Sequence, residues 1–213
     1  MFWLRKNFFP VFIALITLFL CAVNYKAGTI LSGWDTLHPE FNFTLYFKRI
    51  FFGVWQEHQG LGAVASQAHP AEMVRMLLYW PLSFVVPDSF LRYLYFFLTL
   101  ILGPLGVYFF LNKIILKKNR KLSRDSLSFL GSLVYLLNLS TAQHYYVPLE
   151  MFATHFATLP WIFLFGTKFI EDGKKKSLLL LALTTLIAAP SAHTPTLFYV
   201  FFGLFTLYTC FLA

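Results

Sequence analysis

A ten-residue stretch directly after the first long apolar run concentrates side chains that could do chemistry. It runs from Ser32 to Phe41 and contains Asp35, His38 and Glu40. Ionisable groups at the end of a hydrophobic helix lie close to lipid, where charge is costly and usually functional. A carboxylate in such a partly desolvated place can have a raised pKa and take a proton from a hydroxyl group. Asp35 is therefore the candidate general base, and the alternative is a helix cap or a charge solvated at the interface.

His38 and Glu40 lie close enough to Asp35 to complete a site for a divalent cation. Imidazole and carboxylate groups are both common metal ligands, and His58 and His69 could add to them. The spacing matches no zinc pattern, so the identity of any metal stays unknown and His38 and Glu40 are candidates by proximity alone. The alternative is that these histidines hydrogen-bond to neighbours at the membrane interface.

The composition is typical of an integral membrane protein. The 213 residues are 58% hydrophobic and only 12% charged, whereas about 25% of a soluble domain is charged. The formal net charge of +8 could suit nucleic acid, but the basic residues form short runs between apolar segments instead of one face with base-stacking aromatics. The sequence also has no Walker pattern and no nucleophile elbow. These features favour a membrane protein and argue against a nucleic-acid partner or an ATP-driven pump.

Apolar runs predict an all-α, multi-pass transmembrane helical bundle of about six spans. The second run contains Gly103-Pro104, where we expect a kink, and the third could extend to Val147. The predicted spans cover approximately residues 8–23, 90–112, 125–139, 151–170, 177–189 and 196–213.

Charge placement predicts how these spans are oriented. Arg5 and Lys6 precede the first run, and basic clusters follow at 113–124 and 174–176. The positive-inside rule then puts the N-terminus and both clusters in the cytoplasm of a cell-membrane protein. The chain is interpreted as one module, 1–213, whose last apolar run ends without a polar tail, so we expect truncation at the C-terminus. Its parts are a cytoplasmic start and first span at 1–23, an outer loop at 24–87, and spans two to six at 88–213.

The long outer loop has the pattern of two amphipathic helices at the membrane interface. The first is predicted at 40–58 and the second at 71–80, with a connector of small residues at 60–70. The apolar face of the first contains Leu45, Phe47, Ile50, Phe51, Val54 and Trp55.

Basic and aromatic residues of this region are candidates for substrate binding. Outward-facing cations near the lipid boundary can pair with a lipid-linked phosphate, although reaching phospholipid headgroups is the commoner role. Trp55 could stack on a sugar, and the alternative is a place in the interfacial aromatic belt. The basic candidates are Lys48, Arg49, Arg75 and Arg92.

The order of these features resembles GT-C membrane glycosyltransferases, in which an acidic motif follows the first span and a long outer loop precedes many further spans. The spacing is similar to the N-terminal GT-C domain of alpha-(1→3)-arabinofuranosyltransferases over about residues 8–110. The stretches that carry the resemblance are Gly33-Trp-Asp-Thr36, Trp55, Gln67-Ala-His-Pro70, Tyr79-Trp-Pro81 and Val86-Pro-Asp88. His38-Pro-Glu40 departs from that pattern.

The resemblance implies that Asp35 is the catalytic carboxylate and that Gln67 and His69 border the donor or acceptor pocket. It further implies transfer of a pentose or hexose from a polyprenyl-phosphate-linked donor to a glycan or glycolipid acceptor on the outer face, with membrane lipids as partners. No cofactor is required beyond a possible divalent cation. The alternative is a transporter or lipid-handling protein without covalent chemistry, which would place functional polar groups near the bilayer midplane.

Overall fold

The computed structural model describes residues 7–33, 38–53, 55–56, 61–64 and 68–212. Within them the fold is almost entirely helical, as the apolar periodicity predicts, with one antiparallel pair of two-residue strands. The longer helices are α2 (Phe8–Asn24), α6 (Asp88–Phe110), α7 (Lys121–Leu137), α9 (Glu150–Asp172), α10 (Lys175–Ile187) and α11 (Pro195–Leu212). The shorter elements are η1 (Pro39–Phe41), α3 (Phe43–Phe52), β1 (Trp55–Gln56), β2 (Ala63–Val64), α4 (Ala68–Ala71), α5 (Met73–Tyr79), η2 (Pro81–Phe84), the π-helical η3 (Leu111–Ile115), α8 (Leu139–Tyr146) and η4 (Ala189–His193).

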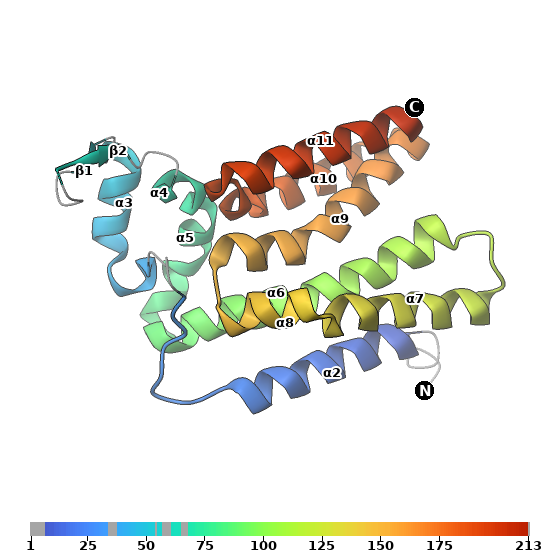
Figure 1. Cartoon of the computed structure of the whole chain (residues 1–213), viewed down its shortest axis with the longest axis horizontal. Coiled ribbons are helices and arrows are strands. Elements are labelled where there is room, and N and C mark those ends of the chain that lie inside the picture. Colours follow the sequence, from blue (N-terminus) through green and yellow to red (C-terminus); the bar gives the residue numbers. More distant parts are fainter. Residues whose placement is uncertain (1–6, 34–37, 54, 57–60, 65–67, 213) are drawn as a thin grey trace.

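The longer helices run back and forth, so the connections alternate between two ends of the molecule (Figure 1). The elements between α2 and α6 gather at one end, and the α6–α7 and α9–α10 turns lie at the other. Helices α6 and α9 form the central pair, with α2 and α7 packed on α6 and with α10 and α11 packed on α9. Which side of a membrane each end would face stays a prediction.

Two of the described helices are long and apolar enough to cross a membrane. They are α6 together with η3, over 28 residues, and α11, over 18 residues. Helix α2 has 17 residues, and α10 has 13, which at about 1.5 Å per residue is shorter than a hydrocarbon core of about 30 Å. The bundle of six spans is therefore not confirmed, although the helical fold is.

Asparagine caps begin two of the helices. The Asn42 side chain accepts a hydrogen bond from Leu45 N at 2.9 Å, so α3 begins there, and it ends at Phe52 instead of continuing to residue 58. The Asn138 side chain accepts one from Thr141 N at 2.9 Å and begins α8. The extension of the third run to Val147 as a single helix is therefore wrong, because a side-chain cap at Asn138 separates α7 from α8.

The predicted connector at 60–70 contains a β-strand and a short helix. Strand β2 pairs with β1 in the register Trp55 to Val64 and Gln56 to Ala63. Gly62 has a φ of +101°, and a Cβ there would lie 2.4 Å from the Trp55 ring. Only glycine suits that combination of backbone angle and close approach.

The loop elements dock on the ends of α6 and α9 through a shared hydrophobic core. Phe43 and Tyr46 of α3 and Met76 and Tyr79 of α5 pack with Leu91, Tyr95 and Phe96 of α6 and with Ala153 of α9. The buried face of α3 is thus the Phe43–Tyr46 side, with Phe47 and Ile50 at its edge. Leu45, Phe51 and Trp55, which we expected on the same apolar face, are exposed.

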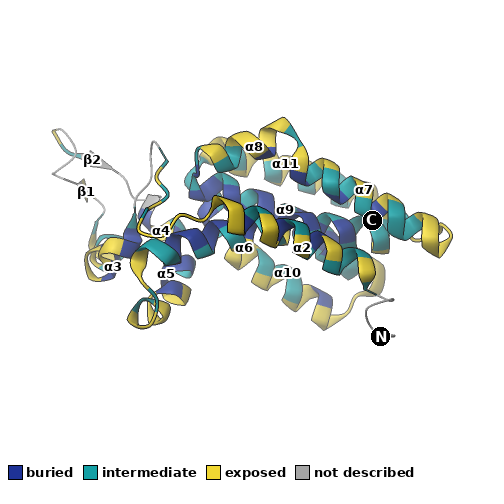
Figure 2. Cartoon of the chain, turned by 90° about the horizontal axis from the view of Figure 1, so that it is seen from below, coloured by how far each residue is buried: buried dark blue, intermediate teal, exposed yellow. Residues whose placement is uncertain are grey.

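Large apolar side chains cover much of the outer surface. Buried residues concentrate along α6 and α9, while the outward faces of α10 and α11 are exposed (Figure 2). A soluble monomer seldom exposes so extensive an apolar surface. Among the large exposed side chains are Leu179, Leu183 and Leu186 of α10 and Tyr199, Phe202 and Phe211 of α11.

Gly103 of α6 lies directly against the Phe156 ring of α9, and substitution there should destabilise the fold. A Cβ at Gly103 would lie 2.3 Å from the Phe156 ring, which is itself stacked on Tyr135 with ring centroids 4.5 Å apart. We expect Gly103→Ala to cost about 1–3 kcal/mol through overpacking. Gly203→Ala on α11 meets nothing within 4 Å and should be neutral or stabilise by up to about 1 kcal/mol. Thermal unfolding in detergent tests this pair, and equal midpoints for the two variants would contradict the packing.

Candidate functional site

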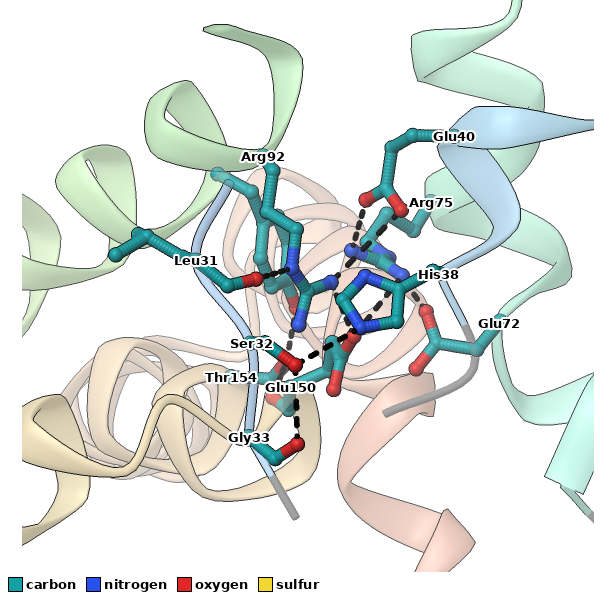
Figure 3. Close-up of polar contacts among 11 residues, drawn as sticks. Leu31, Ser32, Gly33, His38, Glu40, Glu72, Arg75, Arg92, Glu150 and Thr154 are labelled. Atoms are coloured by element: carbon teal, nitrogen blue, oxygen red, sulfur yellow. Dashed lines mark hydrogen bonds and ion pairs between the residues drawn. The ribbon is translucent and has the colours of Figure 1, made fainter. Parts of the chain in front are cut away.

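Five charged side chains meet where the loop docks on the helical bundle. This charge cluster consists of Glu40, Glu72, Arg75, Arg92 and Glu150, and every member is at least 95% buried. Glu40 lies in η1, Glu72 directly precedes α5, and Arg75 lies in α5, whereas Arg92 belongs to α6 and Glu150 to α9 (Figure 3). The cluster therefore joins segments that are far apart in the sequence.

Arg75 is the centre of the loop side of the cluster. Its Nε lies 2.5 Å from Glu72 Oε2, and its Nη1 lies 2.8 Å from Glu40 Oε1. Its Nη2 lies 3.7 Å from Glu150 Oε1, and its guanidinium carbon lies 4.5 Å from the centre of the Tyr95 ring. Glu72 and Arg75 are three residues apart, a spacing that brings two side chains to one face of a helical turn.

Arg92 joins the bundle side of the cluster to the segment that leaves α2. Its Nη1 lies 2.5 Å from Glu150 Oε1 and 3.8 Å from Glu40 Oε2. Its Nε donates a hydrogen bond of 2.5 Å to the carbonyl oxygen of Leu31. Nearby, the hydroxyls of Thr29 and Tyr93 are 2.7 Å apart. The chain after α2 is thus held against α6 by side chains of that helix.

The cluster holds three carboxyl groups and two guanidinium groups, so full ionisation leaves one negative charge in excess. Burial is the main effect that raises the pKa of Glu72 to about 7. The charge of Arg75 lowers this pKa, while the charges of Glu150 and Glu40 raise it. Burial alone would lower the pKa of Arg75, but the surrounding carboxylates raise it well above its usual value. Arg75 stays charged, and Glu72 can take up a proton near neutral pH.

The residues that flank the candidate base lie beside this cluster. Asp35 itself lies outside the described residues, but His38, three residues after it, is next to Arg92 and Glu150 (Figure 3), and Leu31, four residues before it, binds Arg92. The His38 ring Nε2 lies 3.3 Å from the Ser32 hydroxyl. Burial and the charge of Arg92 lower the pKa of His38, so the imidazole is neutral at pH 7.

The predicted substrate-binding residues have different surroundings. Arg75 is 4% exposed and surrounded by carboxylates, so the prediction that it faces the lipid boundary is wrong, because ion pairing in the loop draws it inside. His69 is buried with its ring 4.9 Å from that of Tyr46. Gln67 lies outside the described residues. Lys48 is exposed and Arg49 half-buried on α3, and Trp55 is 56% exposed.

The possible metal site gains no support from the described residues. Within that part of the chain, no group of three or more His, Cys, Asp or Glu side chains is arranged to hold a metal ion. Glu40 faces Arg75 and Arg92 instead, and a carboxylate neutralised by two guanidinium groups is a poor cation ligand. The chemistry proposed below uses no metal.

The charge cluster itself was not predicted from the sequence. The sequence predicts Arg75 and Arg92 as outward-facing cations, but it does not predict their pairing with buried glutamates. One usable signal is that Glu150 opens the first turn of α9, where a carboxylate is favoured by the helix dipole. Another is the spacing of Glu72 and Arg75. The pairing across 58 residues between Arg92 and Glu150 has no local signature.

A groove of about 550 Å³ adjoins the charge cluster on the bundle side. Leu31 lines the groove, and its carbonyl oxygen binds Arg92, while Phe96 lines it with its ring 5.2 Å from the Arg92 guanidinium. The lining is mostly apolar and aromatic, with a few hydroxyls. It comes from α2, α6, α7 and α8, and includes Leu20, Asn24, Phe97, Leu100, Leu136, Thr141, Tyr145 and Tyr146.

Comparison with protein-family models, with curated proteins and with solved structures finds no match for this chain.

The raised pKa of Glu72 predicts a pH-dependent stability. Its value of about 7 exceeds the ordinary glutamate pKa of 4.5. Between pH 4.5 and pH 7 the folded protein therefore binds more protons than the unfolded chain, and its stability falls as the pH rises through this range. The shift corresponds to on the order of 3 kcal/mol. Glu72→Gln leaves two carboxylates for two guanidinium groups and should flatten this dependence. The groups that face Glu72 are Arg75, Glu40, Glu150, Tyr46 and Tyr95.

Thermal unfolding in detergent from pH 5 to pH 8 measures this dependence in both proteins. The account requires a steeper fall for the wild type than for Glu72→Gln. Parallel curves would show that Glu72 keeps an ordinary pKa in the folded protein.

Removing Arg92 should destabilise the protein far more than removing an exposed partner. Arg92→Met leaves Glu150 and Glu40 buried without that compensating charge, which typically costs about 3–5 kcal/mol. Lys117→Met breaks the exposed pair with Glu171, whose side chains are 60% and 44% exposed, and should cost about 0–1 kcal/mol. Denaturant or thermal unfolding of the two variants measures the difference. Comparable losses would mean that the cluster contributes no more than a surface ion pair.

Proposed function

We propose that this chain is the membrane module of a GT-C-like glycosyltransferase that uses a polyprenyl-phosphate-linked sugar. The observation that carries the proposal is the docking of the loop through the charge cluster. It holds the chain on both sides of Asp35 against Arg92 of α6, through the Leu31 carbonyl oxygen before it and the Glu40 carboxylate after it. Catalysis by proximity needs a base that is held in place, and a base next to a docked segment meets this need.

The proposal includes an inserted bundle of about six spans with a cytoplasmic N-terminus, as the charge pattern suggests. The alternating helices and the exposed apolar surface support it. Its shortest members, such as α10, would cross a locally thinned bilayer or sit beside longer neighbours. The loop from residue 24 to residue 87 would then face the outer side of the cell membrane.

The groove beside Leu31 supports a lipid-linked donor. It is lined mainly by aromatic and aliphatic side chains, and it reaches the segment that Arg92 holds. A polyprenyl chain in this groove would place its phosphate near the loop, at the depth where a bilayer changes from hydrocarbon to headgroups. Lys48 is an exposed cation of α3 that would meet that phosphate, with Arg49 next to it in the chain, while Arg75 positions the loop.

In the proposed reaction the acceptor hydroxyl attacks the anomeric carbon of the donor sugar. Asp35 takes the hydroxyl proton as the new carbon–oxygen bond forms, and the bond between the anomeric carbon and the phosphate oxygen breaks. The polyprenyl phosphate leaves with the bonding electrons, and the configuration at that carbon inverts. Nearby cations stabilise the charge that develops on the leaving phosphate.

The remaining predicted residues would shape the sugar-binding side. Trp55 is exposed on the β1–β2 pair, where its ring could stack on a sugar of the donor or of a glycan or glycolipid acceptor. Gln67 and His69 would border the same pocket. The buried contact between His69 and Tyr46 indicates that His69 acts by holding the loop in shape.

The position of the buried charges favours a reaction at the membrane surface over transport across the membrane. Arg92 and Glu150 lie in the first turns of α6 and α9, on the loop side. Deeper in the described helices the buried polar side chains are uncharged, such as Thr99, Ser132 and Thr158. A transporter would instead concentrate functional polar groups near the midplane.

Asp35→Asn should abolish transfer without unfolding the protein. Loss of a general base typically lowers the rate by about 10²–10⁴-fold, while binding of the lipid-linked donor is retained. Asp88→Asn makes the same change at an exposed residue on the same side and should leave the rate within about twofold. Transfer from radiolabelled polyprenyl-phosphate pentose and hexose donors in proteoliposomes measures this. Wild-type rates in Asp35→Asn, or no donor binding by the wild type, would contradict the proposal.

A further inference from the structure

A second polar cavity lies at the opposite end of the bundle from the charge cluster. This basic pocket has a volume of about 600 Å³ and lies between η3, the start of α7, the end of α9 and the start of α10. Six of its lining residues are basic: Lys113, Lys117, Arg124, Lys168, Lys174 and Lys176. Only two are acidic, Glu171 and Asp172.

The two acidic residues are already engaged. Glu171 lies 3.3 Å from Lys117, and Asp172 lies 3.6 Å from Lys174. Asp172 Oδ1 also accepts hydrogen bonds from the backbone N–H of Lys174 at 3.0 Å and from the Ser177 hydroxyl at 3.1 Å. Among the described residues, no carboxylate pairs with Lys113, Lys168 or Lys176. The pocket thus keeps an uncompensated positive charge.

Local structure holds this positive charge in place. The π-helical turn η3 presents Lys113, and its ammonium group lies 4.7 Å from the centre of the Phe109 ring. The neighbouring Asn112 donates a hydrogen bond of 2.7 Å to Asp125 of α7. Gly173, with a φ of +59°, lets α9 turn directly into α10, so the N-terminus of α10 opens at the pocket. The free backbone N–H groups of that helix end add to the positive potential.

Apolar surface adjoins the pocket on one side. Ile114 and Leu180 line it, and Leu179, Leu183 and Leu186 are exposed further along α10. A ligand with a charged head and hydrocarbon chains matches this arrangement. A small soluble anion would use the basic residues but leave the apolar side without a role.

We infer that the basic pocket binds the phosphate headgroup of an anionic phospholipid, whose acyl chains lie along α10. Lysines hold phosphate as point charges, and basic pockets between membrane helices suit such headgroups. The inference requires insertion in a membrane but does not depend on glycosyl transfer. The binding chemistry is that of a phosphodiester with an additional hydroxylated or charged head, as in phosphatidylglycerol.

Native mass spectrometry of the detergent-purified full chain with added phosphatidylglycerol or phosphatidylcholine tests this inference. We expect one tightly bound phosphatidylglycerol, at least tenfold favoured over phosphatidylcholine. Lys113→Gln combined with Lys168→Gln should weaken that binding on the order of tenfold to a hundredfold. The matched control, Lys118→Gln with Lys175→Gln, removes the same charge from exposed lysines outside the pocket and should keep the affinity.

Three results would overturn the inference. Equal binding of the two lipids would show that the headgroup is not recognised. An equal loss in the control would show a general effect of net charge. The same thermal stabilisation by millimolar inorganic phosphate as by phosphatidylglycerol would assign the pocket to a soluble phosphate. Each readout is independent of transferase activity, so failure here leaves the proposed function to its own test.

Discussion

The structure depends on the burial of two arginines among three glutamates at one end of the helical bundle. Removing such charges from water is costly, and only close, well-compensated pairing offsets that cost. Arg75 belongs to the loop, and Arg92 and Glu150 belong to the central helices, so ion pairs among them join the loop to the bundle. The elements that carry the loop are short, with seven residues in α5 and ten in α3. Helices of that length are marginal in isolation, so they depend on docking.

Docking also holds the segment that precedes Asp35 against the bundle. Because Arg92 binds the Leu31 carbonyl oxygen and Thr29 contacts Tyr93, the segment that leads to Asp35 follows the surface of α6. The groove and the charge cluster share Leu31 as a neighbour. A lipid-bearing substrate and a polar reaction centre could therefore meet at this point. The same residues that stabilise the loop thus define where a reaction would occur.

The sequence predicted the helical elements better than their ends and partners. Apolar runs located α2, α6, α9 and α11 to within a few residues, because periodicity and length are local properties. The break at Asn42 was missed, since a capping asparagine looks like any polar residue within an apolar run. The predicted end of the third run at residue 139 lies close to the break at Asn138. The predicted spans depend on a membrane, and two described helices meet the length and hydropathy that a crossing requires.

The candidate site was less predictable because its contacts are distant in sequence. Arg75 looked like an exposed cation, since nothing near it reveals that Glu40 and Glu150 lie within reach. Three-residue spacing identifies Glu72 as its neighbour, but not the burial that raises the pKa of that carboxyl group. Asp35 and Gln67 lie outside the described residues, so their roles stay predictions.

Hydrogen–deuterium exchange of the unmodified protein tests most directly whether the loop is docked on the bundle. The backbone amides of α5 at residues 77–80 should exchange within about tenfold of the rate of the outer turns of α6 at residues 92–96, since both belong to one cooperative unit. A seven-residue helix is marginal in isolation, so such protection would come from its docking on the bundle. Exchange of α5 at the rate of an unfolded segment, with α6 still protected, would contradict the account.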